Sequence, residues 1–366
     1  MSKTSFVPSG AKVKVIGLGG AGCNAVTRMV REQIRGVEFI AMNTDAQHLA
    51  ITEASVRIQL GIRATRGMGA GGDHTVGQRS AEENRDEIKE VVDGADMVFI
   101  AAGMGGGTGT GSAPLVAELA KRSGALTIGV VTKPFSFEGG HRSKVAEEGI
   151  MDLVDKVDTL VIIPNDRLLK LCDQKTGMEN AFRLADQILH HGVQAIAEVV
   201  TVPGLVNLDF ADVRAVMKDA GPAWMSVGRA SGQNRAKEAA KEALSSPLLD
   251  VSVQGATGVL FNVAGGSNLT LFEVNAAAEI IRQAVHPDAN IVFGVLLDPN
   301  MGNEIRLTLI ATGFAGKGML GANREDEIMQ LLKGKSEEEL ELPSFMRYRN
   351  SPEQRSHFKE PPKKFR

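Results

Sequence analysis

The chain has 366 residues, of which 43% are apolar and 23% charged, and this balance is typical of a soluble globular protein with about two domains. Its net charge of −3, with one tryptophan and one tyrosine, argues against nucleic-acid binding, which depends on basic patches and stacking aromatic side chains. No apolar run is long enough for a membrane span, and residues 1–10 lack the apolar core of a signal peptide.

After a short lead, the chain begins with a strand, a glycine-rich turn and a helix. Residues 13–16 predict the strand, the sequence GLGGAG at 17–22 predicts the turn, and residues 23–34 predict the helix. The turn matches the G-x-G-x-x-G pattern, and Asp45 follows the next predicted strand, 37–42, as a dinucleotide site requires. Taken alone, this segment predicts a nicotinamide-dependent oxidoreductase.

Two further glycine-rich segments end predicted strands. Residues 67–73 follow the strand 56–60 and precede a helix at 75–92, and residues 103–111 follow the buried strand 97–102. In an open parallel sheet the carboxyl ends of the strands share one edge, where ligands bind. A dinucleotide needs only one such loop, whereas a triphosphate can contact all three. No G-x-x-x-x-G-K-[ST] motif occurs, which excludes an ordinary P-loop NTPase.

The sequence GMGGGTGTG at 103–111 is the strongest candidate for a phosphate-binding loop. Without Cβ atoms its backbone N–H groups can approach a ligand, and the start of the helix predicted at 115–121 adds partial positive charge. Thr108 and Thr110 supply hydroxyl groups, and Pro114 is expected in the first helical turn, where proline is tolerated. A flexible linker is the alternative interpretation, but a linker is not expected between a buried strand and a helix.

Two more strands complete the predicted sheet, at 126–132 and 159–163. Each is followed by polar residues that belong to the same edge. Glu138 and Arg142 come after the first of these strands, and their four-residue spacing also suits an ion pair on a helix surface.

A long helix is predicted at 178–202. Apolar residues lie along one of its faces at three- and four-residue spacing, and Phe182 on that face is more typical of core than of a ligand contact. Asp209 and Asp212 then open the helix 213–220. Their spacing favours helix capping, with both carboxylates near the positive end of the helix dipole.

The second half of the chain predicts a smaller α/β domain. Its predicted elements are a strand at 224–229, a helix at 234–244, a strand at 258–263, a helix at 270–285 and strands at 291–297 and 304–312. From Gly316 the pattern weakens into a charged segment and a basic end, which we predict to be a tail. Cys23 and Cys172 are the two cysteines, too few for a disulfide framework or a structural zinc site, and they favour a reducing cytoplasm.

Seven short motifs occur in a characteristic order. They are GLGGAGCN at 17–24, NTD at 43–45, GAGG at 69–72, GGGTGTG at 105–111, TKPF at 132–135, IPND at 163–166 and NLDFADV at 207–213. From residue 11 to residue 316 the chain therefore resembles the FtsZ family, the tubulin-like GTPases of bacterial cell division. The resemblance implies an α/β, tubulin-like fold, in which a Rossmann-type parallel-sheet GTP-binding domain is joined by a long central helix to a smaller α/β domain. The expected parts are a disordered lead at 1–11, the GTP-binding domain at 12–176, the central helix at 177–202, the C-terminal α/β domain at 203–315, a linker at 316–340 and a tail at 341–366.

The resemblance also implies a site that binds GTP or GDP with Mg²⁺. Its nucleotide-binding residues would be Gly20, Ala21, Gly22, Cys23, Asn24, Gly71, Gly72, Gly105, Gly106, Gly107, Thr108, Gly109, Thr132, Glu138, Arg142, Asn165, Phe182 and Asp186. Residues 20–24 and 107–109 would hold the phosphates, Glu138 and Arg142 the ribose and its surroundings, and Asn165 and Asp186 the guanine edge. A carboxylate such as Asp186 accepts both N–H donors of guanine, which adenine does not offer. No residue is assigned to a metal site of the protein alone.

The resemblance further implies self-assembly. In the family, the loop that contains Asn207, Asp209 and Asp212 enters the nucleotide site of the next subunit and orients water and Mg²⁺ there, a role compatible with capping. Such a protein forms head-to-tail filaments and, at mid-cell, the cytoplasmic division ring. A non-catalytic nucleotide-binding scaffold is the alternative of another class.

The tail contains a second motif of this family. PSFMRYR at 343–349 is similar to the short peptide that docks on membrane-tethering division proteins. The chain departs from the family in a linker that looks shorter and in the extension 350–366, which continues past the peptide.

Overall fold

The computed structural model describes residues 10–34, 36–169, 177–202, 209–246, 248 and 253–314. Contacts between Cα atoms divide the chain after Ala315, and the described residues all belong to the first part. The predicted lead up to residue 9, the linker, the tail with its peptide 343–349, and Asn207 lie outside the described residues.

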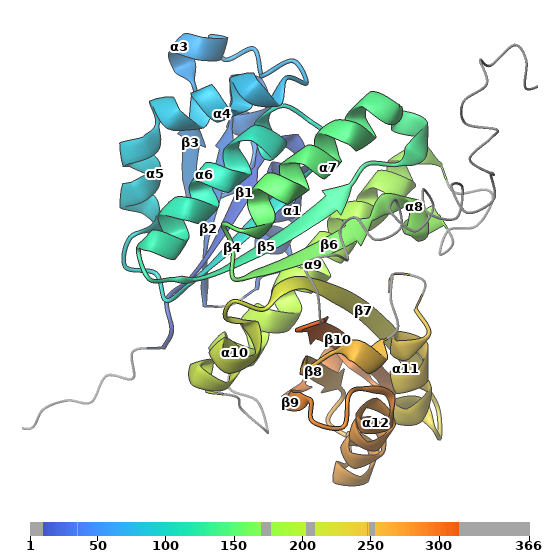
Figure 1. Cartoon of the computed structure of the whole chain (residues 1–366). Helices are drawn as coiled ribbons and strands as arrows, with labels where there is room; N and C mark the ends of the chain where they lie inside the picture. The colour runs from blue at the N-terminus through green and yellow to red at the C-terminus, as the bar shows by residue number, and fades with distance from the viewer. Residues whose placement is uncertain are drawn as a thin grey trace, which may run out of the picture. The chain divides into compact units, whose positions relative to one another are not determined.

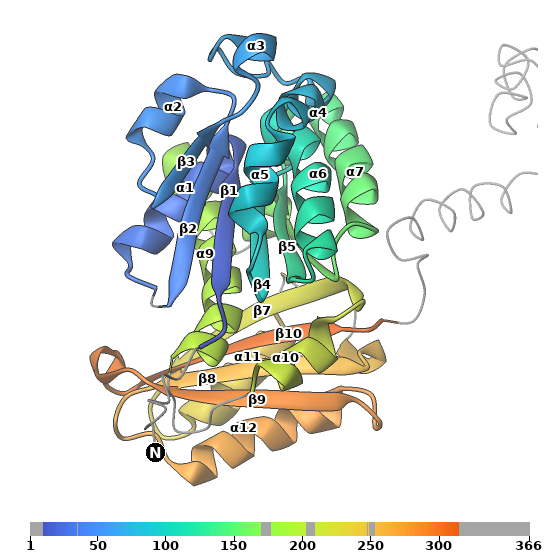
Figure 2. The same ribbon diagram turned by 90° about the vertical axis from the view of Figure 1, so that its left-hand side faces the viewer.

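Six parallel strands form the sheet of the first domain (Figures 1 and 2). In sheet order they are β3 (Val56–Gln59), β2 (Val37–Asn43), β1 (Val13–Leu18), β4 (Met97–Gly103), β5 (Leu126–Lys133) and β6 (Thr159–Pro164). β4 is buried along nearly its whole length, as expected of a parallel strand covered on both faces. The order 3-2-1-4-5-6 is that of the dinucleotide-binding fold, and its direction reverses between β1 and β4.

Helices cover both faces of this sheet. They are α1 (Gly19–Arg31), α2 (Ala46–Ile51), α3 (Ile62–Thr65), α4 (His74–Glu83), α5 (Arg85–Val92), α6 (Thr108–Arg122), α7 (Gly140–Val154), α8 (Asn165–Leu168) and α9 (Met178–Thr201). α1 packs against α9 on one face, and α4, α5, α6 and α7 lie together on the other (Figure 2). The apolar stripe of α9 therefore faces the core, as its spacing predicts.

Several helix boundaries differ from the prediction. The helix expected at 75–92 is two helices, because Asn84 breaks it: its Oδ1 accepts a hydrogen bond from the Gly61 N–H at 2.8 Å and its Nδ2 donates to Glu87. α6 begins at Thr108, so Pro114 lies inside the helix and not in its first turn. α7 was not predicted, since its first turn is glycine followed by polar residues and shows no clear apolar period.

The second domain has four strands and two layers of helices. Its elements are α10 (Phe210–Met217), β7 (Gly221–Ser231), α11 (Arg235–Leu244), η3 (Val253–Gly255), β8 (Gly258–Gly265), α12 (Leu271–Ala284), β9 (Asn290–Leu297), η4 (Pro299–Met301) and β10 (Glu304–Thr312). The strand order is β7-β10-β8-β9, with β10 antiparallel to both neighbours. Along β8, Phe261 faces the core beneath α11 and α12, whereas Leu260 belongs to the core shared with α9 and α10.

The two sheets are joined, which the sequence did not predict. The first three residues of β7 pair in parallel with β6, through Thr159 with Gly221, Leu160 with Pro222 and Val161 with Ala223. The remainder of β7 pairs with β10. The described part of the protein therefore has one sheet of ten strands.

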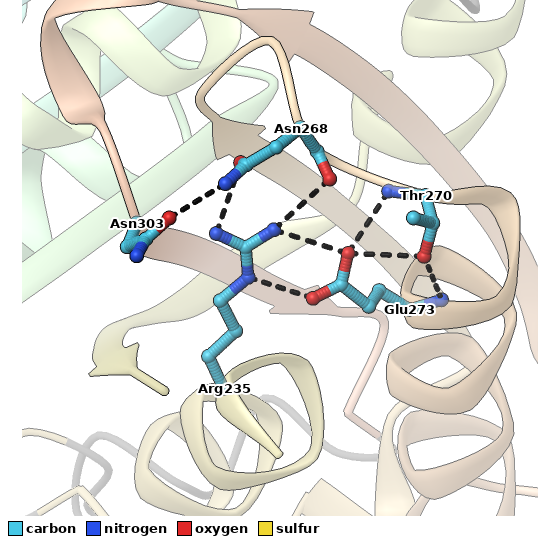
Figure 3. Close-up of polar contacts among 5 residues, drawn as sticks. All are labelled: Arg235, Asn268, Thr270, Glu273 and Asn303. Atoms are coloured by element: carbon cyan, nitrogen blue, oxygen red, sulfur yellow. Dashed lines mark hydrogen bonds and ion pairs between the residues drawn. The ribbon is translucent and has the colours of Figure 1, made fainter. Parts of the chain in front are cut away.

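A buried arginine holds the second domain together (Figure 3). Arg235, at the start of α11, donates to both carboxylate oxygens of Glu273 at 2.6 and 3.1 Å and to Asn268. Thr270 and Glu273 form a capping box at the start of α12. The Asn268 side chain donates to Asn303 in the turn before β10, so this polar cluster connects four segments. Hydrogen bonding from Arg235 lowers the pKa of Glu273 to about 2.

Candidate functional site

A cavity of about 430 Å³ opens where the strand order reverses, at the carboxyl ends of β1 and β4. It is lined by Leu18, Gly19, Gly20, Ala21, Asn24, Gly103, Met104, Gly106, Gly107, Thr108, Gly109, Thr132, Pro134, Glu138, Arg142, Asn165, Phe182, Ala185 and Asp186. We call it the nucleotide cavity. Ligands of doubly wound sheets bind at this position.

Two helices begin at the nucleotide cavity. α1 starts at Gly19, directly after β1, and α6 starts at Thr108, after a short loop from β4. Their N-terminal N–H groups have no partner within the helix and carry partial positive charge, so both ends favour an anion. Because one ligand can meet both ends, the geometry suits a chain of phosphates better than a single one.

The glycines around the cavity have two different roles. Gly19 has a positive φ of 66°, and a Cβ on it would lie 2.9 Å from the Gly109 nitrogen. A Cβ on Gly107 would lie 2.7 Å from the Cβ of Ala70 in the third loop. Gly20 and Gly106, in contrast, have no such neighbour and face open space. Most of the glycines therefore let three loops pack together, and only a few leave room for a ligand.

The two threonines of the β4–α6 loop also differ. Thr108 lines the cavity, and its Oγ1 lies 2.6 Å from the Oγ1 of Thr44. The Oγ1 of Thr110 instead accepts a hydrogen bond from the Gly105 N–H at 2.9 Å, and the residue is 2% exposed. The Thr110 hydroxyl therefore holds the loop, and Thr110 lines neither this cavity nor the one described below, so its role toward an anion stays a prediction.

Polar groups at the other end of the cavity suit a base. Burial raises the pKa of Asp186 to about 6, and the nearby Arg28 guanidinium acts in the opposite direction. The Oδ1 of Asn165 is buried and has no hydrogen-bond partner among the residues that the structure describes. Phe182 is 40% exposed at this end and packs edge-on against Phe135, so it is not the core residue that its position in the stripe favours.

Glu138 and Arg142 both line the cavity and form an ion pair. The Nη1 of Arg142 donates to the Oε2 of Glu138 at 2.5 Å, and the Oε1 of Glu138 accepts from the Phe135 N–H at 2.9 Å. Glu138 ends the short helix η1 (Ser136–Glu138) whereas Arg142 lies in α7, so the pair bridges two elements and is not a contact along one helix.

A second cavity of about 470 Å³ adjoins these residues, and we call it the outer cavity. It is lined by Gly71, Gly72, Asp73, His74, Gly105, His141, Arg142, Lys144, Val145 and Glu148. Three residues predicted for the nucleotide, Gly71, Gly72 and Gly105, lie here and not in the nucleotide cavity. Arg142 lines both cavities.

Two predicted nucleotide contacts line neither cavity. A Cβ on Gly22 would lie 2.3 Å from the Ala101 carbonyl oxygen, so this glycine lets α1 pack on β4. The Cys23 side chain is fully buried, and burial raises the pKa of its thiol to about 12. Neither residue therefore offers a side chain to the nucleotide cavity.

The predicted catalytic carboxylates lie away from the nucleotide cavity. Asp209 is the N-cap residue of α10 and Asp212 lies in its first turn, and both side chains are exposed. The carboxylate of Asp209 makes no capping hydrogen bond. Asp209 therefore occupies the N-cap position that the spacing favours, but its side chain does not cap the helix. Neither residue lines the nucleotide cavity or the outer cavity.

Two protein-family models match this chain, one in each domain. A model of the tubulin/FtsZ family GTPase domain matches residues 12–173, and a model of the FtsZ family C-terminal domain matches residues 221–315. The chain belongs to the tubulin/FtsZ family. It is therefore a GTPase with the tubulin-like α/β fold, as predicted, which excludes both the nicotinamide-dependent oxidoreductase and the non-catalytic scaffold.

Solved structures agree with this assignment. The empty FtsZ dimer from M. jannaschii is 46% identical with a TM-score of 0.81, over 83% of this chain and 89% of that one. CetZ1 from Haloferax volcanii, solved as a GDP-bound monomer, is 22% identical with a TM-score of 0.72, over 87% and 99%, and shows the fold alone. CetZ2 from the same organism, solved as a protofilament with GTPγS, is 18% identical with a TM-score of 0.71, over 88% and 99%.

Two kinds of feature are absent from the described residues. None of the helices there has both the length and the apolar character to cross a membrane. Within the same residues, no group of three or more His, Cys, Asp or Glu side chains is arranged to hold a metal ion.

The prediction missed several cavity residues. Gly19, Gly103, Met104, Pro134 and Ala185 all line the nucleotide cavity. Each is a neighbour of a predicted residue at a strand end or on α9, so extending each motif by one or two positions would have found them. Thr44 does not line the cavity, but its hydroxyl contacts that of Thr108. The sequence could have indicated it, because it lies in the NTD motif of the family.

Proposed function

We propose that GTP binds in the nucleotide cavity and is hydrolysed at the contact between two copies of the chain. In this proposal the starts of α1 and α6 hold the phosphates, with Thr108 as a hydroxyl donor. Glu138 and Arg142 lie beside the ribose. Asp186 accepts hydrogen bonds from guanine, and its buried carboxylate gains the donors that it lacks in the empty protein.

The position of the acidic residues of α10 carries the proposal of a shared site. Asp209 and Asp212 are exposed and line neither described cavity of their own chain, and the Asp209 carboxylate makes no capping hydrogen bond. A second copy can bring them, together with Asn207, to the outer cavity next to the terminal phosphate. There they would orient the attacking water, which is the role of a general base or positioning group in phosphoryl transfer.

Mg²⁺ belongs to the same proposal. The ion prefers oxygen ligands and is usually held by one or two carboxylates together with substrate phosphates. Asp209 and Asp212 fit this preference, since both carboxylates are exposed. When bound, Mg²⁺ would neutralise the charge that develops on the phosphates.

Assembly in the cell follows from the shared site. Different surfaces at the two ends of each copy produce head-to-tail filaments that do not close. We propose that these filaments form the division ring at mid-cell, in the cytoplasm, and that residues 343–349 dock on membrane-tethering division proteins. The structures solved as an FtsZ dimer and as a CetZ2 protofilament support assembly of this kind.

Phosphate release measured against protein concentration tests the shared site. The specific activity with GTP should rise steeply above a threshold concentration at which light scattering also rises, whereas GDP, ATP and NADH should produce neither signal. A specific activity with GTP that stays constant from well below to well above this threshold would contradict the shared site.

A further inference from the structure

Four polar groups form a chain from the backbone after β2 to the nucleotide cavity. The Oδ1 of Asn43 accepts a hydrogen bond from the Asp45 N–H at 3.3 Å. The Nδ2 of Asn43 lies 3.2 Å from the Nδ1 of His48, and the Nε2 of His48 lies 3.0 Å from the Oδ1 of Asn24. Asn24 lines the nucleotide cavity, whereas His48 does not.

The backbone sets the direction of every hydrogen bond in this chain. An N–H can only donate, so the Asp45 N–H requires the oxygen of the Asn43 amide and leaves its NH₂ facing His48. That NH₂ donates to the Nδ1 of His48, which must then be the unprotonated ring nitrogen. The Nε2 carries the proton and donates to the oxygen of Asn24. The NH₂ group of Asn24 is left for the cavity.

We infer that His48 is a positioning residue that holds Asn24 as a hydrogen-bond donor toward the nucleotide. Without His48 the Asn24 amide can turn over and present its oxygen to the electron-rich atoms of the ligand. This inference rests on the proposed function, because it takes the ligand of the cavity to be a guanine nucleotide. Asn43 is 3% exposed, and its backbone carbonyl accepts a hydrogen bond from the Leu60 N–H. The series of hydrogen bonds therefore starts from a residue that is buried and held through its backbone.

The first test is GDP affinity measured by calorimetry on the nucleotide-free full chain. His48→Leu should weaken GDP binding about three- to tenfold, the range expected when one neutral hydrogen bond is lost. His48→Gln should restore binding to within about twofold, because an amide offers an acceptor and a donor with nearly the spacing of the two ring nitrogens. Gln47→Leu is the matched control on the same helix, since this side chain is exposed, and it should bind like the parent.

The second test asks whether His48 acts through Asn24. In an Asn24→Ala background, His48→Leu should cause no further loss, because the group that it orients is absent. Asn24→Asp keeps an acceptor for His48 but removes the donor in the cavity, so it should bind GDP more weakly than the parent even with His48 intact and the fold unchanged.

Each outcome decides one question. Unchanged GDP affinity of His48→Leu, or an equal loss with and without Asn24, would overturn the positioning role while the nucleotide site stands. A parent protein that does not bind GDP would overturn the site and the positioning role together.

Discussion

At the scale of single residues, the cavity contains a carboxylate that is costly for the empty protein. Asp186 is partly buried, and among the described residues no hydrogen-bond donor reaches its carboxylate, so burial raises its pKa from the ordinary 3.8 to about 6. A group whose charged form is disfavoured in the folded state lowers stability wherever the unfolded chain carries that charge. The residue that we propose for guanine recognition therefore lowers the stability of the free protein.

Asp186→Asn should thus stabilise the nucleotide-free protein and weaken GDP binding. The unfolded carboxyl ionises at lower pH than the folded one, so the parent loses stability as the pH rises from 3.8 to about 6 and stays at the lower level above. At pH 7 the variant should gain about 1–3 kcal/mol in the free energy of unfolding, and below pH 4 it should gain little. Urea unfolding at the two pH values measures this, and a variant less stable than the parent at pH 7 would contradict it.

Asp212 allows a test in which binding and turnover separate. Asp212→Asn should keep GTP affinity and filament formation but lower turnover about 10²-fold or more, because the lost charge acts on the transition state and not on bound substrate. Nucleotide titration, light scattering and phosphate release are the three measurements.

The matched control for Asp212 is Glu238→Gln, since Glu238 is also an exposed acid in the first turn of a helix. It should change none of the three quantities. If Asp212→Asn lost affinity and turnover in equal proportion, the carboxylate would have a structural role in α10.

At the scale of elements, α12 is fixed by the polar cluster around Arg235 (Figure 3). α11 packs on the strands mainly through alanines, Ala236, Ala239, Ala240 and Ala243, which bring it close but bury little apolar area each. The Arg235–Glu273 pair therefore carries an unusual share of the contact between α11 and α12. Arg235 is 5% exposed, so removal of its partner would leave a buried charge.

Glu273→Gln should destabilise the second domain by about 3 kcal/mol at neutral pH. The pKa of Glu273 is held at about 2, so its contribution is fully present above its ordinary value of 4.5 and is lost as the pH falls from 4.5 toward 2. The difference in unfolding free energy between parent and variant should shrink over the same window. Glu279→Gln on the same helix alters only an exposed ion pair with Arg282 and an exposed hydrogen bond from Gln283, and it should change stability by less than about 1 kcal/mol. Equal effects of the two substitutions would contradict this account.

At the scale of the whole molecule, the two domains of the described part of the chain are joined by strand pairing and helix packing. β7 pairs with β6 of the first domain and with β10 of the second, and α9 packs against strands of both. The proposed contact of a neighbouring copy with α10 would therefore be connected to the nucleotide cavity through hydrogen-bonded and packed elements. The tail follows these domains in the chain and lies outside the described residues.

Deletion of residues 343–366 should leave GTP hydrolysis and filament formation nearly unchanged and abolish recruitment to membranes by a tethering protein. Phe345, Met346 and Tyr348 alternate with arginines, a pattern suited to docking in a groove of a partner. The measurement is cosedimentation with vesicles that carry the purified tether. If the double variant Phe345→Ala, Arg347→Ala is still recruited, the peptide 343–349 is not the anchor, and the basic extension 350–366 becomes the candidate.

The sequence by itself determined the first sheet, the order of its glycine loops and the family, because these follow from local patterns. Buried parallel strands appear in a sequence as short apolar runs. Glycines directly after such a strand indicate the edge of the sheet where ligands bind. It also led to most residues of the nucleotide cavity, such as Thr108, Glu138 and Asp186.

Only the tertiary structure decided which of these residues line the nucleotide cavity. Thr110 and Gly22 belong to the same motifs as Thr108 and Gly20. The Thr110 hydroxyl, however, accepts a hydrogen bond from a loop N–H, and β4 occupies the space beside Gly22. The join of β6 to β7 and the contact of His48 with Asn24 likewise connect residues far apart in the chain. Spacing cannot predict such contacts, because they depend on how packed elements place distant groups within hydrogen-bond distance.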